Sequence, residues 1–218
     1  MFVGHYAPVF ALRAVRKTPG LAAGFVAVQL VDIAFFSLSY FGIEKWAANP
    51  SLKGFTPVDL YYMPFTHSLV ASAVWGTLAA MVAALVSPKG RRLGNGIAIG
   101  LLVVSHWFLD LIVHRHDLPL LNDAGEKLGF GLWDYPLAVI PLEMGLLFAG
   151  FSFYLARTTP TGAIGRVAPW LVLAVLCAAQ FINWFTPPAS DTATFSGMGL
   201  AAYLGLAGAA WMLDRARN

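Results

Sequence analysis

Long uninterrupted apolar segments dominate this sequence and limit the folds that the chain can adopt. A bilayer-spanning α-helix needs about 20 mostly apolar residues, and we find six segments of sufficient length. They cover residues 21–43, 64–87, 93–114, 131–156, 165–185 and 193–213. Only 11% of the 218 residues are charged, against about 25% in a soluble domain. The sequence therefore predicts an all-α integral membrane protein with about six transmembrane helices, in a single polytopic domain over residues 1–218.

A further apolar segment, from Phe2 to Val15, precedes the first span and is too short to cross the membrane. Pro8 interrupts it, and Thr18-Pro19-Gly20 would separate it from the first span. We expect it to lie along the membrane interface or to enter the protein as a re-entrant half-helix, which requires packing against protein. Positive charge follows the segment instead of preceding it, which argues against a cleaved signal peptide.

Basic residues divide unevenly between the two sets of loops. Ten of the fourteen fall on one side of the predicted spans: Arg13, Arg16, Lys17, Lys89, Arg91, Arg92, Arg157, Arg166, Arg215 and Arg217. The positive-inside rule then places both termini in the cytoplasm. We interpret the basic residues behind the net charge of +3 as topology signals, and we therefore expect no nucleic-acid partner.

Several ionisable residues lie inside the apolar segments, where burial of a charge is costly and usually functional. They are Asp32, His67, His106, Asp110 and Glu143, joined by His5 if the N-terminal segment enters the membrane. Counted at about 1.5 Å per residue from the basic clusters, they lie about 16–33 Å from the cytoplasmic edge. All of them therefore fall in the middle and the outer half of the membrane.

The most informative local pattern is Ser105-His106-Trp107-Phe108-Leu109-Asp110. A histidine and an aspartate at positions i and i+4 lie on one face of a helix, one turn apart. This spacing suits the binding of one metal ion or the bridging of two, and His114 follows one turn later. Imidazole and carboxylate ligands suit zinc, and also manganese or iron. The alternative is a simple His–Asp hydrogen bond within a helix bundle.

The other candidate functional residues each have an alternative interpretation. Asp32 stands among apolar residues in mid-span and needs a cation, a metal or a proton as its partner. His67 follows Thr66 at the start of the second span, where an interfacial histidine beside a helix cap is the alternative. Glu143 lies beside Pro141 and Met144, and a protonated carboxyl that serves packing is equally compatible with its position.

Taken in order, Gly4-His5, Asp32, Thr66-His67-Ser68 and Ser105-His106-x-x-x-Asp110 resemble a known family. The family is the YdjM-like group of LexA-regulated metal-dependent hydrolases of the bacterial inner membrane, which is similar to zinc-dependent phospholipase C and P1 nuclease. The resemblance covers residues 4–117 and implies a multi-pass protein of the bacterial cytoplasmic membrane. It also implies that these histidines and aspartates hold zinc, which activates water against a phosphate ester.

Two positions depart from the family pattern. The family commonly has Pro-Asp-x-Asp where this chain has Val31-Asp32-Ile33-Ala34. It often has a His-Arg pair shortly before Thr-His-Ser, where this chain has Tyr62 and Met63. A multi-metal cluster, a single metal ion and a site without activity therefore all stay open.

These observations favour a membrane-embedded metal-dependent hydrolase that acts on a phosphoester or lipid-like substrate from the periplasmic leaflet. The expected ligands of the divalent ion, with zinc favoured, are His5, Asp32, His67, His106 and Asp110. Glu143 and Asp110 are the expected catalytic carboxylates, since Glu143, or a carboxylate not committed to the metal, would act as general base. The expected partners are membrane lipids.

Two further classes of function stay open. Intramembrane aspartate, glutamate and histidine also form proton or ion relays in transporters. The histidines would alternatively bind a pigment or haem in an accessory subunit of a larger membrane complex. Metal analysis, proton-coupled flux and visible absorbance separate the three classes.

Overall fold

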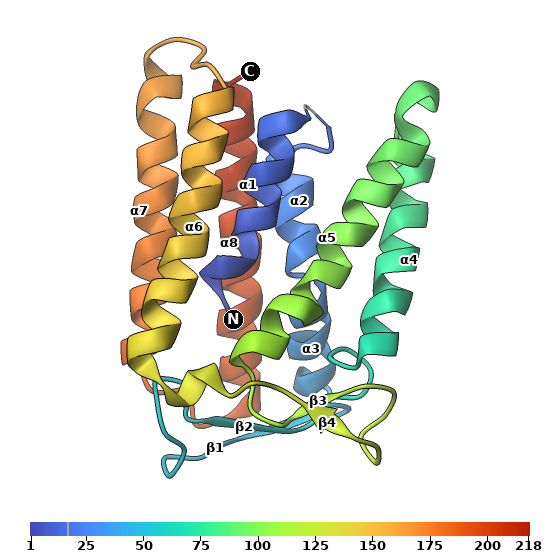
Figure 1. Ribbon diagram of the computed structural model, residues 1–218, viewed down its shortest axis with the longest axis vertical. Coiled ribbons are helices and arrows are strands. Elements are labelled where there is room, and N and C mark those ends of the chain that lie inside the picture. The colour runs from blue at the N-terminus through green and yellow to red at the C-terminus, as the bar shows by residue number, and fades with distance from the viewer. Residues whose placement is uncertain (17) are drawn as a thin grey trace.

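Eight α-helices run along the long axis of the molecule, and short β-hairpins close one end (Figure 1). The computed structural model describes residues 1–16 and 18–218, and Lys17 of the first basic cluster lies outside them. The helices are α1 Tyr6–Val15, α2 Leu21–Val28, α3 Leu30–Tyr40, α4 Leu69–Val86, α5 Arg92–Val113, α6 Pro136–Arg157, α7 Ala163–Phe185 and α8 Thr192–Ala216. Three 3-10 turns accompany them: η1 Val3–His5, η2 Lys89–Arg91 and η3 Leu132–Asp134.

The helices agree with the all-α membrane fold expected from the sequence. In the described part of the chain, five helices, α4 to α8, are long and apolar enough to cross a membrane. Helices α2 and α3 together meet the same test, although their axes bend by 53°. The bend falls at Gln29, whose fully buried side chain donates a hydrogen bond from Nε2 to the carbonyl oxygen of Phe2 (3.3 Å). The predicted span 21–43 is therefore one broken pair of helices.

The N-terminal segment lies inside the bundle. Helix α1 packs against α6 and α2, and its first residues reach only the middle of the molecule's height (Figure 1). Tyr6 and Phe10 are fully buried and contact the ring of Phe25. Burial of such aromatic rings is the main source of stabilisation available to a short helix. The segment is thus packed against protein, as a non-spanning piece at membrane depth must be.

Helices α4 and α5 form a closely packed hairpin. A Cβ atom on Gly100 would lie 3.0 Å from the carbonyl oxygen of Gly76, so glycine at this position lets the two backbones approach. Close approach at small residues is a common way to join helices in a membrane. Most of α4 is otherwise exposed, and its buried residues are Ser72 and Gly76.

Two small hairpins, which the sequence did not predict, cover one end of the bundle. Strands β1 (Lys45–Ala48) and β2 (Val58–Tyr62) pair antiparallel, as do β3 (Leu118–Pro119) and β4 (Lys127–Leu128). Arg115 joins the loops, because its guanidinium donates to Asp134 Oδ1 (2.8 Å) and to the carbonyl oxygen of Lys53 (2.8 Å).

At the same end, Asp191 caps α8. Its Oδ1 accepts a hydrogen bond from the backbone N–H of Thr194 (2.8 Å), which lowers the pKa of the Asp191 carboxyl.

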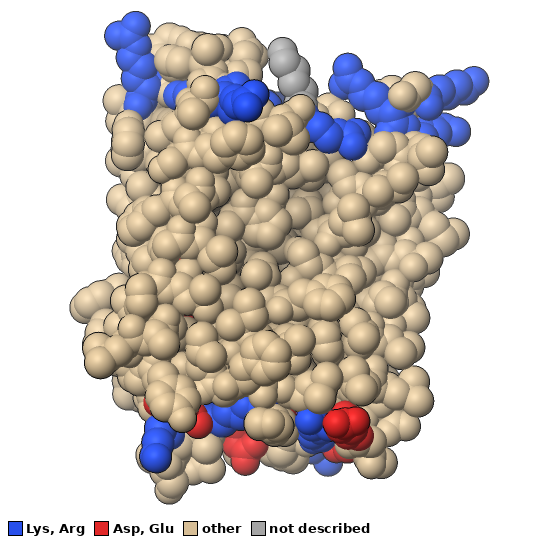
Figure 2. Space-filling model, viewed as in Figure 1, with Lys and Arg blue, Asp and Glu red and all other residues tan. Residues whose placement is uncertain are grey.

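Charged side chains gather at the two ends of the molecule. Figure 2 shows lysine and arginine at the end where α1, α6 and the chain finish, and acidic residues mixed with basic ones at the hairpin end. The visible surface between them carries no charged residue. The described members of the ten-residue basic set therefore lie at one end, as the alternation of the predicted spans requires.

Candidate metal centre

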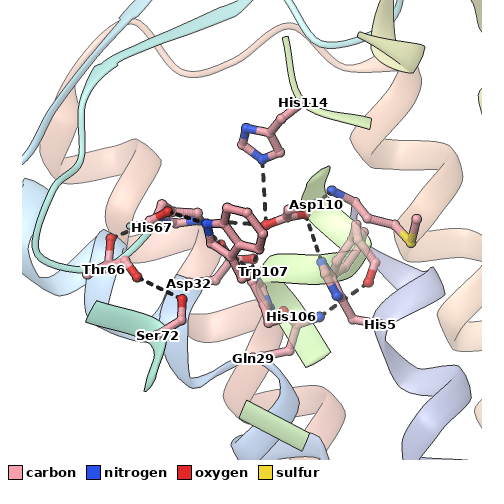
Figure 3. A network of polar contacts seen from close by, with 12 residues as sticks. His5, Gln29, Asp32, Thr66, His67, Ser72, His106, Trp107, Asp110 and His114 are labelled. Carbon is pink, nitrogen blue, oxygen red and sulfur yellow. Dashed lines mark hydrogen bonds and ion pairs between the residues drawn. The ribbon is translucent and has the colours of Figure 1, made fainter. Parts of the chain in front are cut away.

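All five predicted ligands meet in one buried cluster, and His114 joins them (Figure 3). Asp110 lies at its centre and is 1% exposed. The four histidines are also buried, at 3% exposure or less. Asp32 is the most accessible member, with 15% of its side chain exposed. We call the six residues His5, Asp32, His67, His106, Asp110 and His114 the metal centre.

Helix α5 supplies three of these side chains from consecutive turns. His106 Nε2 lies 3.0 Å from Asp110 Oδ2, and His114 Nε2 lies 3.6 Å from the same oxygen. His106, Asp110 and His114 are spaced by four residues, which keeps side chains on one helix face. His114 is the C-cap residue of α5, so its extended backbone leaves the helix while its ring turns back toward Asp110.

Two other segments bring His67 and Asp32 to the same place. His67 precedes α4, whose N-cap is Ser68, not Thr66, because Ser68 Oγ accepts from the backbone N–H of Ala71. His67 Nε2 lies 3.2 Å from Asp32 Oδ1, and His106 Nε2 lies 3.5 Å from it. Asp32 stands in the first turn of α3, directly after the break at Gln29.

The N-terminal segment completes the metal centre from the opposite side. His5 ends η1, and its Nε2 lies 3.1 Å from Asp110 Oδ1. The α-amino group of Met1 lies 2.6 Å from the same oxygen. The rings of His5 and His106 stack with their centroids 3.9 Å apart. The buried position of α1 therefore places a histidine that is distant in sequence beside α5.

The ligand atoms fall into three overlapping groups, and within each group they lie within 4.8 Å of one another. The groups are His5, His106 and Asp110; Asp32, His67 and His106; and His67, Asp110 and His114. The first and third share only Asp110, whose two oxygens face different histidines. A carboxylate in this position is able to bridge two ions.

Three histidines have the ring nitrogen that faces away from the centre held by an oxygen. Nδ1 of His106 lies 2.7 Å from the carbonyl oxygen of Val28, and Nδ1 of His114 lies 2.8 Å from Asp117 Oδ1. Nδ1 of His67 lies 2.8 Å from Thr66 Oγ1. A carbonyl oxygen and a carboxylate only accept, so Nδ1 of His106 and of His114 carries the proton. In the neutral form of each ring, the Nε2 lone pair then points into the metal centre, which is the orientation of metal-binding histidines.

The fit to a cation is clearest at His106. Its Nε2 is fully buried and makes no hydrogen bond with any residue that the structure describes, yet two carboxylates face it. An imidazole nitrogen that faces carboxylate oxygens needs a proton or a metal cation between them, because two lone pairs in contact repel each other. Nitrogen and oxygen ligands of this kind suit zinc, manganese or iron. The donor set therefore fits a divalent metal ion.

Glu44, in the loop between α3 and β1, is linked to His67 through Thr66. Its Oε2 accepts from Thr66 Oγ1 (2.6 Å), and its Oε1 accepts from the backbone N–H groups of Phe65 (2.8 Å) and Thr66 (3.0 Å). Because the Thr66 hydroxyl donates to Glu44, its oxygen is free to accept from His67 Nδ1. Burial raises the pKa of the Glu44 carboxyl, and the hydrogen bonds from Thr66 and Phe65 oppose that shift.

Glu143, the predicted general base, lies beside the three groups but belongs to none of them. Its Oε2 accepts from the backbone N–H of Phe2 (2.9 Å) and of Gly4 (3.4 Å). Gln180 Oε1 similarly accepts from the backbone N–H of Val3 (3.1 Å). These contacts hold the first residues of the chain in position, and the catalytic role of Glu143 stays a prediction.

Sequence reasoning missed part of this arrangement. His114 follows Asp110 by four residues, and that spacing was its available signal. Tyr203 donates to Asp32 Oδ2 (2.6 Å) from 171 residues away, and Glu44 reaches Thr66 from a loop. Neither contact has a sequence pattern of its own. No protein-family model, curated protein or solved structure matches this chain.

Proposed function

We propose that this chain is a membrane-embedded, metal-dependent hydrolase that cleaves a phosphoester or lipid-like substrate. The observation that carries the proposal is the convergence of four histidines and two aspartates from separate segments, with their ligand atoms in three compact groups. The tied Nδ1 atoms of His67, His106 and His114 add to it, since such contacts orient rings toward a metal. The resemblance to YdjM-like hydrolases points to the same chemistry.

The topology that we propose follows the basic residues. Six spans cross the bacterial cytoplasmic membrane, the α2–α3 pair counting as one, and both termini lie in the cytoplasm. Helix α1 is then a re-entrant half-helix that carries His5 from the cytoplasmic side to the metal centre. This arrangement leaves the hairpin end, and the access to Asp32, on the outer face.

Each part of the metal centre has a role in this proposal. One or two divalent ions, with zinc favoured, would be held by the six residues and would supply Lewis acidity toward a phosphate ester and a lowered pKa of water. Asp110 joins the two groups that contain His5 and His114. Asp32, oriented by the hydroxyl of Tyr203, stands at the accessible side as a further ligand or as a base for water. A centre buried this deeply excludes bulk water, which strengthens its electrostatic contacts.

The experiment that tests the proposal is elemental analysis of purified protein, with hydrolysis of bis(4-nitrophenyl) phosphate measured in parallel. We expect stoichiometric zinc, manganese or iron in the wild type, and loss of both metal and hydrolysis in Asp110→Ala. Asp123→Ala is the matched control, because Asp123 lies in an outer loop and pairs with Lys127. Equal metal content in the wild type and Asp110→Ala, or none in either, contradicts the metal centre. Proton-coupled flux without bound metal would favour a transporter instead.

A further inference from the structure

A cavity of about 350 Å³ lies next to the metal centre, between α7, α8 and the outer loops. This volume falls within the range of about 300–1,000 Å³ typical of small-molecule pockets. Most of its lining residues lie between Trp133 and Tyr203, a part of the chain that contributes no ligand to the metal centre. The cavity is therefore formed by other residues than those of the metal centre.

Several wall residues contact the metal centre directly. Tyr203 donates its hydroxyl to Asp32, and the ring of Trp133 lies against the ring of His114 with centroids 4.0 Å apart. Glu143 lines the cavity as well. It accepts a hydrogen bond from the backbone N–H of Phe2, the residue after Met1, whose α-amino group contacts Asp110. One end of the cavity is thus polar and adjoins the most accessible ligand, Asp32.

Most of the remaining wall is apolar and rich in aromatic rings, with Thr56, Asn183 and Thr186 as its polar residues. It includes Phe36, Phe55, Ile182, Trp184, Phe195 and Met198. Gly199 is required beside Phe36, because a Cβ atom there would overlap the Phe36 ring. None of the described residues that line the cavity is a lysine or arginine. The one α-amino group on the wall, that of Met1, is already paired with Asp110, so a free phosphate or a nucleotide would find no unpaired lysine, arginine or amino group among these residues. A hydrocarbon chain, in contrast, finds a matching apolar surface.

We propose that this cavity binds the apolar chain of the substrate, so that the substrate is an amphiphile: a phosphate ester of a lipid. The proposal rests on the proposed function, because it places the phosphate at the metal centre beside Asp32 and Tyr203. The chain of the same molecule then extends from this polar end along Phe36, Phe195 and Met198. A lipid of the outer leaflet has both of the required parts, and loop residues such as Pro57 and Pro187 contribute to the cavity wall.

Photo-crosslinking tests this proposal directly. The probe is a dodecyl phosphate with a diazirine near the end of its chain, added to wild-type protein in lipid nanodiscs. We expect crosslinks to map to the segments 179–184 and 195–203, and unlabelled dodecyl phosphate to compete more than tenfold better than inorganic phosphate or dodecanol. Ala179→Trp fills the cavity and should abolish these crosslinks. Ala178→Trp is the matched control, since Ala178 is exposed and lies outside the cavity wall.

Metal content is measured on the same samples, so that the two proposals fail separately. Absence of metal together with phosphate-selective crosslinks defeats the metal centre but supports the cavity as the site of an amphiphile. Bound metal with crosslinks that Ala179→Trp does not change overturns the cavity proposal alone. Equal competition by dodecanol and dodecyl phosphate also overturns it, because the cavity would then hold any lipid chain and not a phosphate ester.

Discussion

Gly150 of α6 lies against the backbone of Ala7 in α1, so closely that a Cβ atom on Gly150 would be 2.8 Å from both the Cα atom and the carbonyl oxygen of Ala7. This contact limits how closely α1 approaches α6. Helix α1 follows directly on His5, so the packing of α1 bears on the position of His5 beside Asp110. A residue with no ligand atom is thereby linked to the geometry of the metal centre.

Replacement of Gly150 by leucine should therefore weaken metal binding. The larger side chain would push α1 away from α6, at an overpacking cost of about 1–3 kcal/mol, and would move His5 out of reach. The measurement is metal content after purification and dialysis. Gly145→Leu is the matched control on the same helix, because a Cβ atom at Gly145 meets nothing within 4 Å. Full metal occupancy in Gly150→Leu would contradict the role of α1.

His114 should prove to be a ligand of the metal. Its Nε2 faces Asp110 and its Nδ1 is held by Asp117, so we expect His114→Ala to lower metal affinity by at least about tenfold. Competition with a chelator of known affinity measures the change. His116→Ala should bind as the wild type does, because His116 is exposed and belongs to none of the three groups. The same loss in both variants would indicate a general disturbance of the loop.

The Thr66 hydroxyl should tune the metal centre through His67. Thr66→Val keeps the shape of the side chain but removes the link between Glu44 and His67 Nδ1, and we expect metal affinity to fall by about 10–100-fold. Thr66→Ser restores the hydroxyl and should restore most of the affinity. A merely structural role for Thr66 would leave metal affinity unchanged in Thr66→Val and change only thermal stability.

The orientation in the membrane can be tested with single cysteines on a Cys177→Ala background. Ser51 lies in the exposed turn of the β1–β2 hairpin, and Gly90 lies in the exposed connection between α4 and α5. We expect Ser51→Cys to react with a membrane-impermeant maleimide in intact cells, and Gly90→Cys to react only after permeabilisation. The opposite pattern would reverse the proposed orientation.

The sequence was a good guide to the helices because a membrane imposes strong requirements on composition. Apolar length predicted most ends of α4 to α8 to within a few residues. The exceptions are the starts of α4 at Leu69 and α6 at Pro136, against predicted starts at 64 and 131. The break at Gln29 was not predicted, since its cause is a hydrogen bond to Phe2, which is distant in sequence. The hairpins were missed because their strands are only two to five residues long.

Five residues of the metal centre could be singled out from the sequence, because ionisable residues are rare in membrane-spanning segments. His5, Asp32, His67, His106 and Asp110 stood out because an unpaired ionisable group is costly among apolar residues. Contacts made by ordinary residues gave no such signal. Tyr203 and Glu44 lie in no sequence pattern that points to this site, and only the fold places them beside Asp32 and Thr66.

The six residues of the metal centre all come from positions 5–114, whereas α7 and α8 form much of the adjoining cavity wall. On the proposed function, reactivity and substrate recognition would depend on separate parts of the chain. Changes at positions such as Ala179, Ile182 or Met198 would alter what is bound without touching a histidine or an aspartate. A lineage of such proteins would be free to adopt new lipids while retaining one inherited chemistry.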